Sequence, residues 1–366
     1  MGLQCGIVGL PNVGKTTLFN CLSNTRATAS NFPFSTIKPN VGVISVPDPR
    51  LFKLAEIDKP QRVIPATVEF VDISGLARGA SKGEGLGNQF LGHIRDTAVI
   101  IHVLRCFENE DVTHIDGSIN PVRDMETIEF ELQIKDLETV ESRIQKVEKR
   151  AKTGGDKEAA KILELLVKYK ATLEQGLSAS TVEIDEFEKK LLYDLHLLTN
   201  KQVIYVCNVD EKSASSGNKY VEMVKEATAG KNYEIIVIAA EAESEIAELE
   251  TAEERQVFLS DMGLEEPGVN KLIKKAYSML QLETFFTTGK DETRAWTVRR
   301  GTKAPEAAGV IHSDLQRGFI RAEVIKYNDY VTLGNEAACR DAGKLSVQGK
   351  EYVVLDGDIL HIRFNV

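Results

Sequence analysis

The chain has 366 residues, of which 42% are hydrophobic and 27% are charged, and its formal net charge is −10. This length is enough for two or three domains, each with its own core. No apolar run approaches the roughly 20 residues of a membrane span, and we expect no signal peptide, because the N-terminal residues lack its basic region and cleavage site. The acidic balance disfavours nucleic-acid binding by the chain as a whole. The five cysteines are scattered without a C-x-x-C pair, which indicates a reducing, cytoplasmic location.

Short apolar runs alternate with helical stretches over much of the chain. Because such runs are typical of buried parallel strands, we predict an α/β class with right-handed crossovers. The runs that predict strands are residues 5–9, 67–72, 97–104, 202–207 and 234–238.

The interval between Gly75 and Asn208 is far longer than one βα step requires, and its middle has a helical pattern. Two apolar series on either side of the TGGD at 153–156 predict an antiparallel helical hairpin packed as a short coiled coil. Thirty helical residues reach about 45 Å, so we expect the hairpin to project from the domain; the alternative is a helical subdomain lying flat on the sheet. The series consist of Phe130, Ile134, Leu137, Ile144, Val147 and Ala151, then Ile162, Leu165, Leu166, Tyr169 and Leu173.

The pattern changes again near Leu282. AWTVRRGTKAPEAAGVIHSDL predicts a strand, a turn and a helix, and AEVIKY, YVTL, KEYVVLDGD and ILHIRFNV alternate like half-exposed strands. We therefore predict three parts: a discontinuous domain of residues 1–120 and 201–281, an inserted arm of residues 121–200, and a small α+β domain of residues 282–366.

A phosphate-binding loop is the strongest motif. GLPNVGKT, from Gly9 to Thr16, fits G-x-x-x-x-G-K-[ST] and lies between a predicted strand and a predicted helix, which makes a chance Gly-rich turn a poor alternative. Its glycines let backbone N–H groups surround phosphate oxygens, Lys15 bridges the β- and γ-phosphates, and the Thr16 hydroxyl ligates Mg²⁺. The predicted nucleotide-binding residues here are Asn12, Val13, Gly14, Lys15, Thr16 and Thr17.

Two later segments supply the expected partners of this loop. Asp72 ends the run TVEFVD and is predicted to hold Mg²⁺ through water, while the N–H of Gly75 contacts the γ-phosphate. Thr36, in NFPFSTIKPN, lies where a first switch loop belongs and is the second protein ligand that we predict for Mg²⁺. The predicted metal ligands are therefore Thr16, Thr36 and Asp72.

NVDE, at residues 208–211, occupies the place of the N-K-x-D that reads guanine in most proteins with this loop. An Asp at its end accepts from both donors of guanine, whereas Glu211 carries its carboxylate on a longer stem. Losing such a charged pair is enough to abolish a guanine preference. Asn208, Val209 and Glu211 are therefore predicted to bind adenine. The alternative is that Asp210 reads guanine in a shifted register.

Taken together, GLPNVGKTTLFN, NFPFSTIKPNVG, DISGLARGASKGEGLGNQFL, NVDE and RAWTVRRGTKAPEAAGVIHSDLQRGFIRAEVI resemble the YchF / Obg-like ATPase family over essentially the whole chain. The resemblance implies a P-loop G domain, an inserted coiled-coil arm and a C-terminal TGS domain. It also implies ATP hydrolysis in preference to GTP, association with ribosomes, and a link to translation and stress responses. Two departures are Ser35, where a Cys is usual, and KLSVQGK, which is less basic than is typical.

The resemblance also bears on catalysis. Leu76 stands where Ras-like enzymes place a water-orienting Gln, so intrinsic hydrolysis should be slow. The resemblance points to His114 as a catalytic residue beside Lys15 and Gly75, although a loop histidine is more often a surface residue. Asn12 resembles the position that holds K⁺ in related enzymes, which suggests K⁺ as a second cation.

Basic residues cluster at the predicted arm tip and in the C-terminal domain, where they suit phosphate backbones. The resemblance favours a ribosomal contact at both places by a monomeric chain; the alternative is a solvated helix face laced with ion pairs. Three functions stay open: an ATP-hydrolysing switch on the ribosome, a nucleotide-gated RNA- or ribosome-binding adaptor with incidental hydrolysis, and a GTP-hydrolysing switch. The clusters are Arg143, Lys146, Lys149, Arg150, Lys152, Lys157 and Lys161, and then Arg294, Arg299, Arg300 and Lys303 beside Trp296.

Overall fold

The computed structural model describes residues 3–24, 41–73, 86–112, 114, 117–152, 156–231 and 233–365. The chain divides into two compact units, each built from two stretches of sequence. The first comprises Met1–Cys21 and Phe70–Gly268, and the second comprises Leu22–Glu69 and Val269–Val366. No helix among the described residues has the length and apolar character that a membrane span requires.

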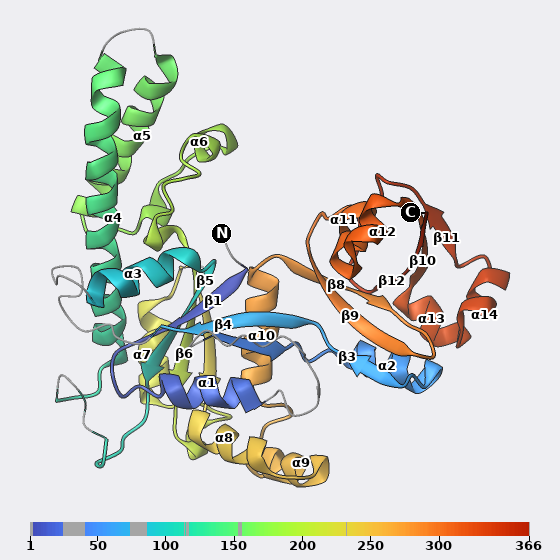
Figure 1. Ribbon diagram of the computed structural model, residues 1–366. Coiled ribbons are helices and arrows are strands. Elements are labelled where there is room, and N and C mark those ends of the chain that lie inside the picture. The colour runs from blue at the N-terminus through green and yellow to red at the C-terminus, as the bar shows by residue number, and fades with distance from the viewer. Residues whose placement is uncertain are drawn as a thin grey trace. The chain divides into compact units, whose positions relative to one another are not determined.

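A parallel sheet forms the centre of the first unit (Figure 1). The sheet has the strand order β2, β4, β1, β5, β6, β7, with β2 (Val41–Ser45) at its edge, and the pairs from β1 to β7 are all parallel. Parallel strands end at the same edge of a sheet, and this edge gathers the site described below. Five of these strands match the five predicted runs and confirm the α/β class: β1 (Gln4–Val8), β4 (Thr67–Asp72), β5 (Val99–Arg105), β6 (Gln202–Asn208) and β7 (Glu234–Ile238).

Helices follow or precede these strands, as an α/β fold requires. Polar caps mark where several of them begin: the side chain of Asn218 accepts hydrogen bonds from the first turn of α7, and Thr251 and Glu254 form a capping box at α9. The helices of this sheet are α1 (Lys15–Asn24), α3 (Leu86–Asp96), α7 (Lys219–Ala227), α8 (Ala240–Glu248) and α9 (Ala252–Asp261).

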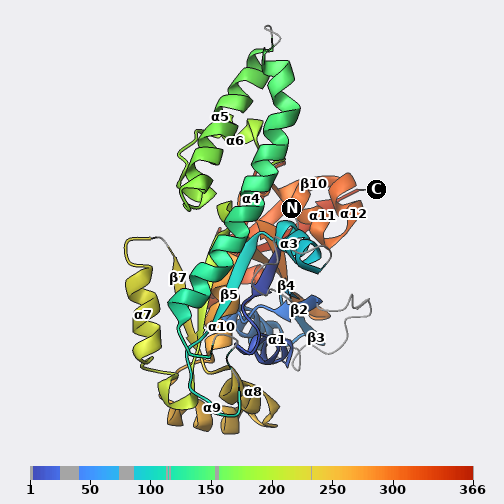
Figure 2. The same ribbon diagram turned by 90° about the vertical axis from the view of Figure 1, so that its left-hand side faces the viewer.

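The predicted arm is present as a long helical hairpin. It consists of α4 (Pro121–Lys152) and α5 (Lys157–Glu174), and both views show it extending away from the sheet of its unit (Figures 1 and 2). The 32 residues of α4 span about 48 Å at 1.5 Å per residue. The alternative of a flat subdomain is therefore wrong.

A narrow apolar seam holds the two helices together. The buried residues of this seam include Val140, Leu165, Leu166, Tyr169 and Leu173, with Leu137, Ile144 and Ile162 packed against them. Phe130 was predicted to belong to the seam but is 58% exposed, because α4 has no α5 opposite its first turns.

The return from the arm to the sheet is fixed at one buried carboxylate. Asp136 of α4 accepts hydrogen bonds from the backbone N–H groups of Leu198 and Thr199, at 2.6 and 2.8 Å, and from the Thr199 hydroxyl. Burial raises the pKa of Asp136, while these donors oppose that effect. The segment between α5 and β6 contains one further short helix, α6 (Glu186–Leu191), and two 3₁₀ turns, η2 (Ala179–Thr181) and η3 (Leu198–Asn200).

The second unit contains a mixed sheet in the order β11, β10, β12, β8, β9, β3. Its core is formed by Phe285, Trp296 and the small residues of α11. The strands are β3 (Arg62–Ile64), β8 (Leu282–Thr287), β9 (Glu292–Arg299), β10 (Phe319–Lys326), β11 (Ser346–Gln348) and β12 (Asp358–Phe364). Its other elements are β2 (Val41–Ser45), α2 (Pro49–Asp58), α10 (Gly268–Met279), α11 (Ala304–Ile311), α12 (Ser313–Arg317), α13 (Tyr327–Leu333) and α14 (Glu336–Asp341).

Two of the strand predictions for this region are wrong. YVTL lies in the helix α13, which ends at Gly334 in the left-handed conformation. KEYVVLDGD forms turns and makes only the isolated bridge between Lys303 and Val353 before β12 begins at Asp358. For YVTL, alternation over four residues does not separate a helix turn from a strand. Among the apolar side chains of KEYVVLDGD only Val354 is buried, while Val353 and Leu355 are exposed, so the apolar residues do not form a packed strand face.

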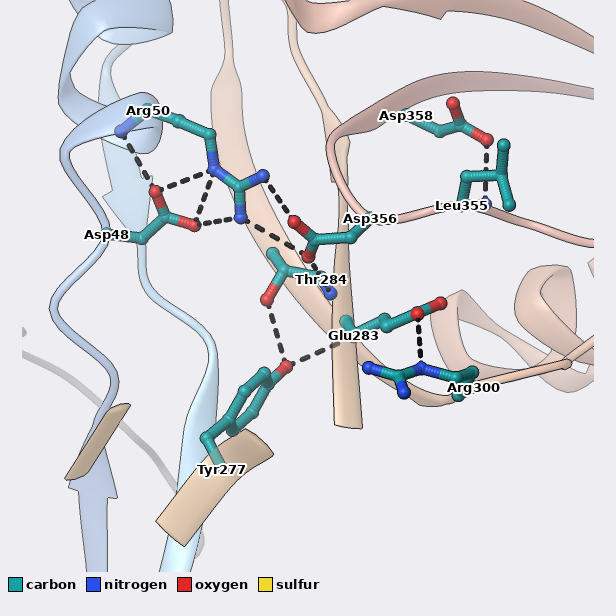
Figure 3. Close-up of polar contacts among 9 residues, drawn as sticks. All are labelled: Asp48, Arg50, Tyr277, Glu283, Thr284, Arg300, Leu355, Asp356 and Asp358. Carbon is teal, nitrogen blue, oxygen red and sulfur yellow. Dashed lines mark hydrogen bonds and ion pairs between the residues drawn. The ribbon is translucent and has the colours of Figure 1, made fainter. Parts of the chain in front are cut away.

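Residues 41–66 belong to the second unit, far along the sequence from its remaining strands. β3 pairs in parallel with β9, and Arg50 of α2 donates hydrogen bonds to Asp48 and to Asp356 (Figure 3). Burial opposes ionisation of Arg50, but the bonds to these two carboxylates outweigh it and raise the pKa of the guanidinium. The compact units thus divide the chain elsewhere than at residues 120, 200 and 281, and those domain boundaries stay a prediction.

Candidate nucleotide site

The loop between β1 and α1 has the backbone of a phosphate cradle. Gly14 has a φ of +94° and Asn12 a φ of +63°, and α1 begins at Lys15. A Cβ at Gly14 would lie 2.2 Å from Nδ2 of Asn208, and a Cβ at Gly9 would lie 2.6 Å from the carbonyl oxygen of Val103. Both positions therefore require glycine, and the motif has the conformation that the sequence predicts.

Lys15 is folded onto this loop. Its ammonium donates hydrogen bonds to the carbonyl oxygens of Gly9 and Leu10, at 2.9 and 2.7 Å. Burial lowers the pKa of Lys15, and the charge of Asp72 opposes that shift. Thr16 is exposed in the first turn of α1, and Val13 is buried beneath the loop. A phosphate oxygen is a stronger partner for an ammonium than a carbonyl, so this lysine is poised to exchange partners.

The donors for a metal ion are only partly within the described residues. Asp72 is buried at the carboxyl end of β4, close enough to Lys15 to influence its pKa, and Thr16 presents a hydroxyl. A carboxylate and a hydroxyl are oxygen donors of the kind that Mg²⁺ prefers, so the residues present fit that ion. Thr36, Gly75 and Leu76 lie outside the described residues.

Asn208 connects the end of β6 to the phosphate loop. Its Nδ2 donates a hydrogen bond of 2.9 Å to the carbonyl of Val13, and its Oδ1 accepts one of 3.1 Å from the N–H of Ala240 at the start of α8. Both contacts are buried. An amide nitrogen has two N–H groups, so one remains for a base.

The two carboxylates of NVDE have different roles. Asp210 caps the short 3₁₀ turn η4 (Glu211–Ser213): it accepts hydrogen bonds of 3.1 Å from the N–H and the hydroxyl of Ser213. Glu211 is the exposed first residue of that turn, and Val209 is buried. Since Asp210 is engaged as a cap, the shifted-register reading of guanine has no support in this geometry.

These residues surround a cleft of about 530 Å³ at the carboxyl edge of the sheet. Six predicted residues line it together: Asn12, Gly14 and Thr17 from the phosphate loop and α1, with Asn208, Val209 and Glu211 from NVDE. Such a volume suits a nucleoside, and pockets at this edge are typical of α/β sheets. The other lining residues are Phe107, Glu108, Asn109, Val112, Asp210, Glu241, Ala242 and Glu245.

Sequence reasoning missed the segments that follow β5 and β7. Phe107, Glu108, Asn109 and Val112 come directly after β5, and Glu241 opens the helix after β7. The signal was present, because the ends of adjacent parallel strands meet at one edge. Neither segment carries a motif of its own, so only the strand order of the sheet assigns them to the cleft.

His114, the predicted catalytic histidine, is buried away from the lining of this cleft. Its Nε2 lies 2.9 Å from Oδ2 of Asp124, in the first turn of α4. The guanidinium of Arg123 donates to the other oxygen of the same carboxylate, at 3.0 and 3.2 Å. His114 is thus held by the arm helix, and its catalytic role stays a proposal.

Comparisons with known proteins agree with this geometry. Residues 4–135 match the family model of a 50S ribosome-binding GTPase, and residues 282–365 match the YchF-GTPase C-terminal model, which is described as a protein of unknown function. Proteins named ribosome-binding ATPase YchF from Bacillus subtilis, Haemophilus influenzae and Escherichia coli are 52%, 50% and 49% identical, with all of this chain and of each relative covered. The chain belongs to the YchF family.

A solved structure supports the assignment at the level of the fold. The Schizosaccharomyces pombe YchF GTPase matches 98% of this chain and 97% of its own with a TM-score of 0.89 and 35% identity. The family resemblance and the P-loop fold class predicted from sequence are therefore confirmed. The names of these relatives differ on the nucleotide, because the bacterial YchF proteins are named ATPases and the yeast YchF protein a GTPase.

The basic residues of this YchF chain are largely paired with acidic neighbours. At the arm, Arg143 pairs with Asp194, Arg150 with Asp156, Lys152 with Glu148, and Lys161 with Glu164 and Glu188. In the C-terminal region Arg300 pairs with Glu283, Lys303 pairs with Glu351, and Arg294 lies 3.8 Å above the Trp296 ring. The predicted positive clusters are therefore partly neutralised within the chain.

Proposed function

We propose that this chain is a ribosome-binding ATPase that slowly hydrolyses ATP to ADP and phosphate and acts as a conformational switch in translation and stress regulation. The proposal rests on membership of a family whose bacterial relatives are named ribosome-binding ATPases. It also rests on a phosphate loop and a nucleoside-sized cleft that meet at Asn208.

The proposal that the base is adenine rests on the different roles of Asp210 and Glu211. Asp210 caps its own turn, and Glu211 offers its carboxylate on a longer stem than the guanine-reading Asp. The described lining of the cleft has no lysine or arginine to donate to O6 of guanine, whereas adenine has no oxygen at that position that requires a donor.

Catalysis in this proposal uses the residues of the cradle. Mg²⁺ would be held by Thr16, Thr36 and, through water, Asp72, and it would screen the negative charge of the phosphates. Lys15 would leave the carbonyls of the loop for the β- and γ-phosphates, and the N–H of Gly75 would contact the γ-phosphate. K⁺ beside Asn12 belongs to the same proposal as a second cation.

Through Nε2, His114 would orient the attacking water only after it leaves Asp124. A buried histidine that is hydrogen-bonded to a carboxylate cannot also hold a water molecule at the γ-phosphate through the same nitrogen. Slow hydrolysis by the free protein is the consequence that we expect from this arrangement.

The ribosome would be contacted through the arm tip and the C-terminal TGS domain of a monomeric, cytoplasmic chain. At the tip, Lys146 and Lys157 form no ion pair with any residue that the structure describes, and they remain available for phosphate groups. The boundaries proposed for the three domains are residues 1–120 with 201–281, residues 121–200, and residues 282–366.

The preferred base can be tested by equilibrium binding. ATP and GTP affinities are measured for the wild-type protein, Glu211→Asp and Asp210→Asn. We expect the wild type to prefer ATP and Glu211→Asp to gain GTP affinity, because the shorter carboxylate restores the guanine contact. Asp210→Asn is the control and should leave the preference unchanged. GTP binding by the wild type that equals ATP binding, or is lost in Asp210→Asn, would show that guanine is read.

Single-turnover hydrolysis with and without ribosomes tests the switch. We expect ribosomes to accelerate ATP hydrolysis. If ribosomes bind the protein but leave the rate unchanged, the nucleotide-gated adaptor with incidental hydrolysis becomes the better description.

A further inference from the structure

Arg105, the last residue of β5, is a buried cation that no motif assigned. Only 2% of its surface is exposed, and its guanidinium is surrounded by the loop that follows it. Nε donates to the carbonyl of Phe107 at 3.2 Å, Nη2 to that of Asn109 at 3.1 Å, and Nη1 to that of Val112 at 2.8 Å. The guanidinium also lies 4.8 Å from the centre of the Phe107 ring. One side chain thus fixes both ends and the middle of residues 107–112.

The same loop forms one wall of the nucleotide cleft. Phe107, Asn109 and Val112 line it together with Asn208 and Val209. The register of the sheet explains this placement, because Arg105 is paired with Asn208 and the N–H of Cys106 donates to the Asn208 carbonyl at 2.8 Å. The residue that holds the loop therefore stands beside the residue expected to read the base.

The contacts of Arg105 are better suited to shaping a loop than to stabilising a charge pair. Burial lowers its pKa, while the charges of Asp124 and Tyr220 oppose that shift. Its guanidinium donates to three backbone carbonyls, which fold around the planar donor group in one arrangement. A lysine has one nitrogen and cannot reach three carbonyls spread over six residues in the same way.

We propose that Arg105 is a positioning residue that holds the 107–112 loop as a preformed wall for the purine and thereby sets both nucleotide affinity and the preference between purines. This inference rests on the proposed function, because it requires a purine nucleotide in the cleft. With the wall fixed, water is kept from the edges of the base, and a guanine that lacks its partners is rejected. With the wall loose, water enters and hydrates either base, so the preference shrinks.

Binding of fluorescent ADP and GDP to Arg105→Lys and Arg105→Met tests the inference. We expect ADP affinity to fall about tenfold, which corresponds to about 1.4 kcal/mol, and GDP affinity to fall less, so that the preference narrows. In steady-state hydrolysis the loss should appear in KM rather than in kcat. Arg255→Met is the matched control, since Arg255 also donates to a backbone carbonyl, that of Leu249, but does not line the cleft.

The outcomes separate this inference from the proposed function. A wild type that binds neither nucleotide overturns the proposed function. If the wild type binds ADP and the folded Arg105 variants bind ADP and GDP as tightly as the wild type does, only the proposed role of Arg105 is overturned. An equal loss for both nucleotides shows a merely structural role and also overturns it.

Hydrogen exchange of the nucleotide-free wild type keeps the inference testable even if the variants fail to fold. The N–H of Val112 donates to the Asn109 carbonyl, and that of Asp111 donates to the Asn109 side chain at 2.9 Å. A loop that is preformed should protect these two amides before nucleotide binds. Free exchange at both positions would show that the wall is not preformed and would overturn the proposal.

Discussion

The side chain of Asn208 and the carbonyl of Val13 are joined by a buried hydrogen bond of 2.9 Å across 195 residues of sequence. The other end of the same amide accepts from Ala240, so one side chain joins the phosphate loop, the end of β6 and the start of α8. Gly14 has no room for a side chain because this amide lies against it. The predicted base-reading and phosphate-binding parts of the site are therefore joined in one hydrogen-bonded structure.

Replacing Asn208 with Ala should weaken both folding and nucleotide binding. The Val13 carbonyl and the Ala240 N–H would lose their partners in a buried place, which costs roughly 1–3 kcal/mol for each unsatisfied group. We expect a lower urea midpoint and at least a tenfold loss of ADP affinity. Asn335→Ala is the control: it removes the N-cap of α14 and costs about 1 kcal/mol without touching the cleft. Unchanged ADP binding in folded Asn208→Ala would contradict the coupling.

The elements with strong local signals were predictable from sequence. The phosphate loop, the five parallel strands and the helical hairpin each combine a periodic pattern with flanking turn residues, and all three are present. YVTL illustrates the limit, since four residues of which three are hydrophobic fit a helical turn as well as a strand, and in the structure they belong to α13 with Tyr330 buried. Local pattern alone cannot make that choice.

Contacts between residues that are far apart in the sequence could not be predicted either. β3 pairs with β9, and Arg50 donates to Asp356, which lies 306 residues away in the sequence. No local sequence pattern around β3 or Arg50 indicates which distant residues they contact. The burial of His114 against Asp124 has the same cause, because a loop histidine and an aspartate in a first helical turn each look ordinary in sequence. Likewise Arg105 ends an apolar strand and gives no sign that three carbonyls surround it.

His102 should make the stability of the protein depend on pH. It is buried in β5 beside Tyr205, and burial, with a smaller effect of Lys15, lowers its pKa from 6.5 to about 3. Between these two values the unfolded chain binds a proton that the folded protein excludes, so stability falls as the pH falls from about 6.5 toward 3. The full effect of this residue is at most about 5 kcal/mol.

Urea unfolding of the wild type and His102→Gln between pH 7 and pH 4 measures this contribution. We expect the variant to lose less stability on acidification than the wild type, whatever its stability at pH 7. Asn335→Ala is the control, because it removes a helix cap but no titratable group and should leave the slope of stability against pH unchanged. Parallel pH profiles for the wild type and His102→Gln would show that His102 does not titrate in this way.

Asp124→Asn should free His114 and accelerate hydrolysis, if the histidine is catalytic. The substitution keeps the shape of the side chain but removes the charge that strengthens its contact with His114. We expect single-turnover ATP hydrolysis without ribosomes to rise by up to about tenfold, equivalent to about 1.4 kcal/mol, with ATP affinity little changed. Adding His114→Ala should abolish the gain. A gain that survives in the double variant would assign it to some other group.

Arg50→Met should destabilise the second unit, because the buried carboxylate of Asp48 loses its cationic partner. Asp48 is buried and receives both Nε and Nη2 of Arg50 at 2.8–3.1 Å, whereas Asp356 is half-exposed and also accepts from the N–H of Thr284 (Figure 3). We expect a loss of roughly 2–4 kcal/mol for Arg50→Met and under about 1 kcal/mol for Asp356→Asn, because solvent compensates only the second carboxylate. Arg317→Met removes an exposed ion pair with Asp314 and should change stability little. Thermal unfolding of the three variants would contradict this ranking if Arg50→Met and Arg317→Met behaved alike.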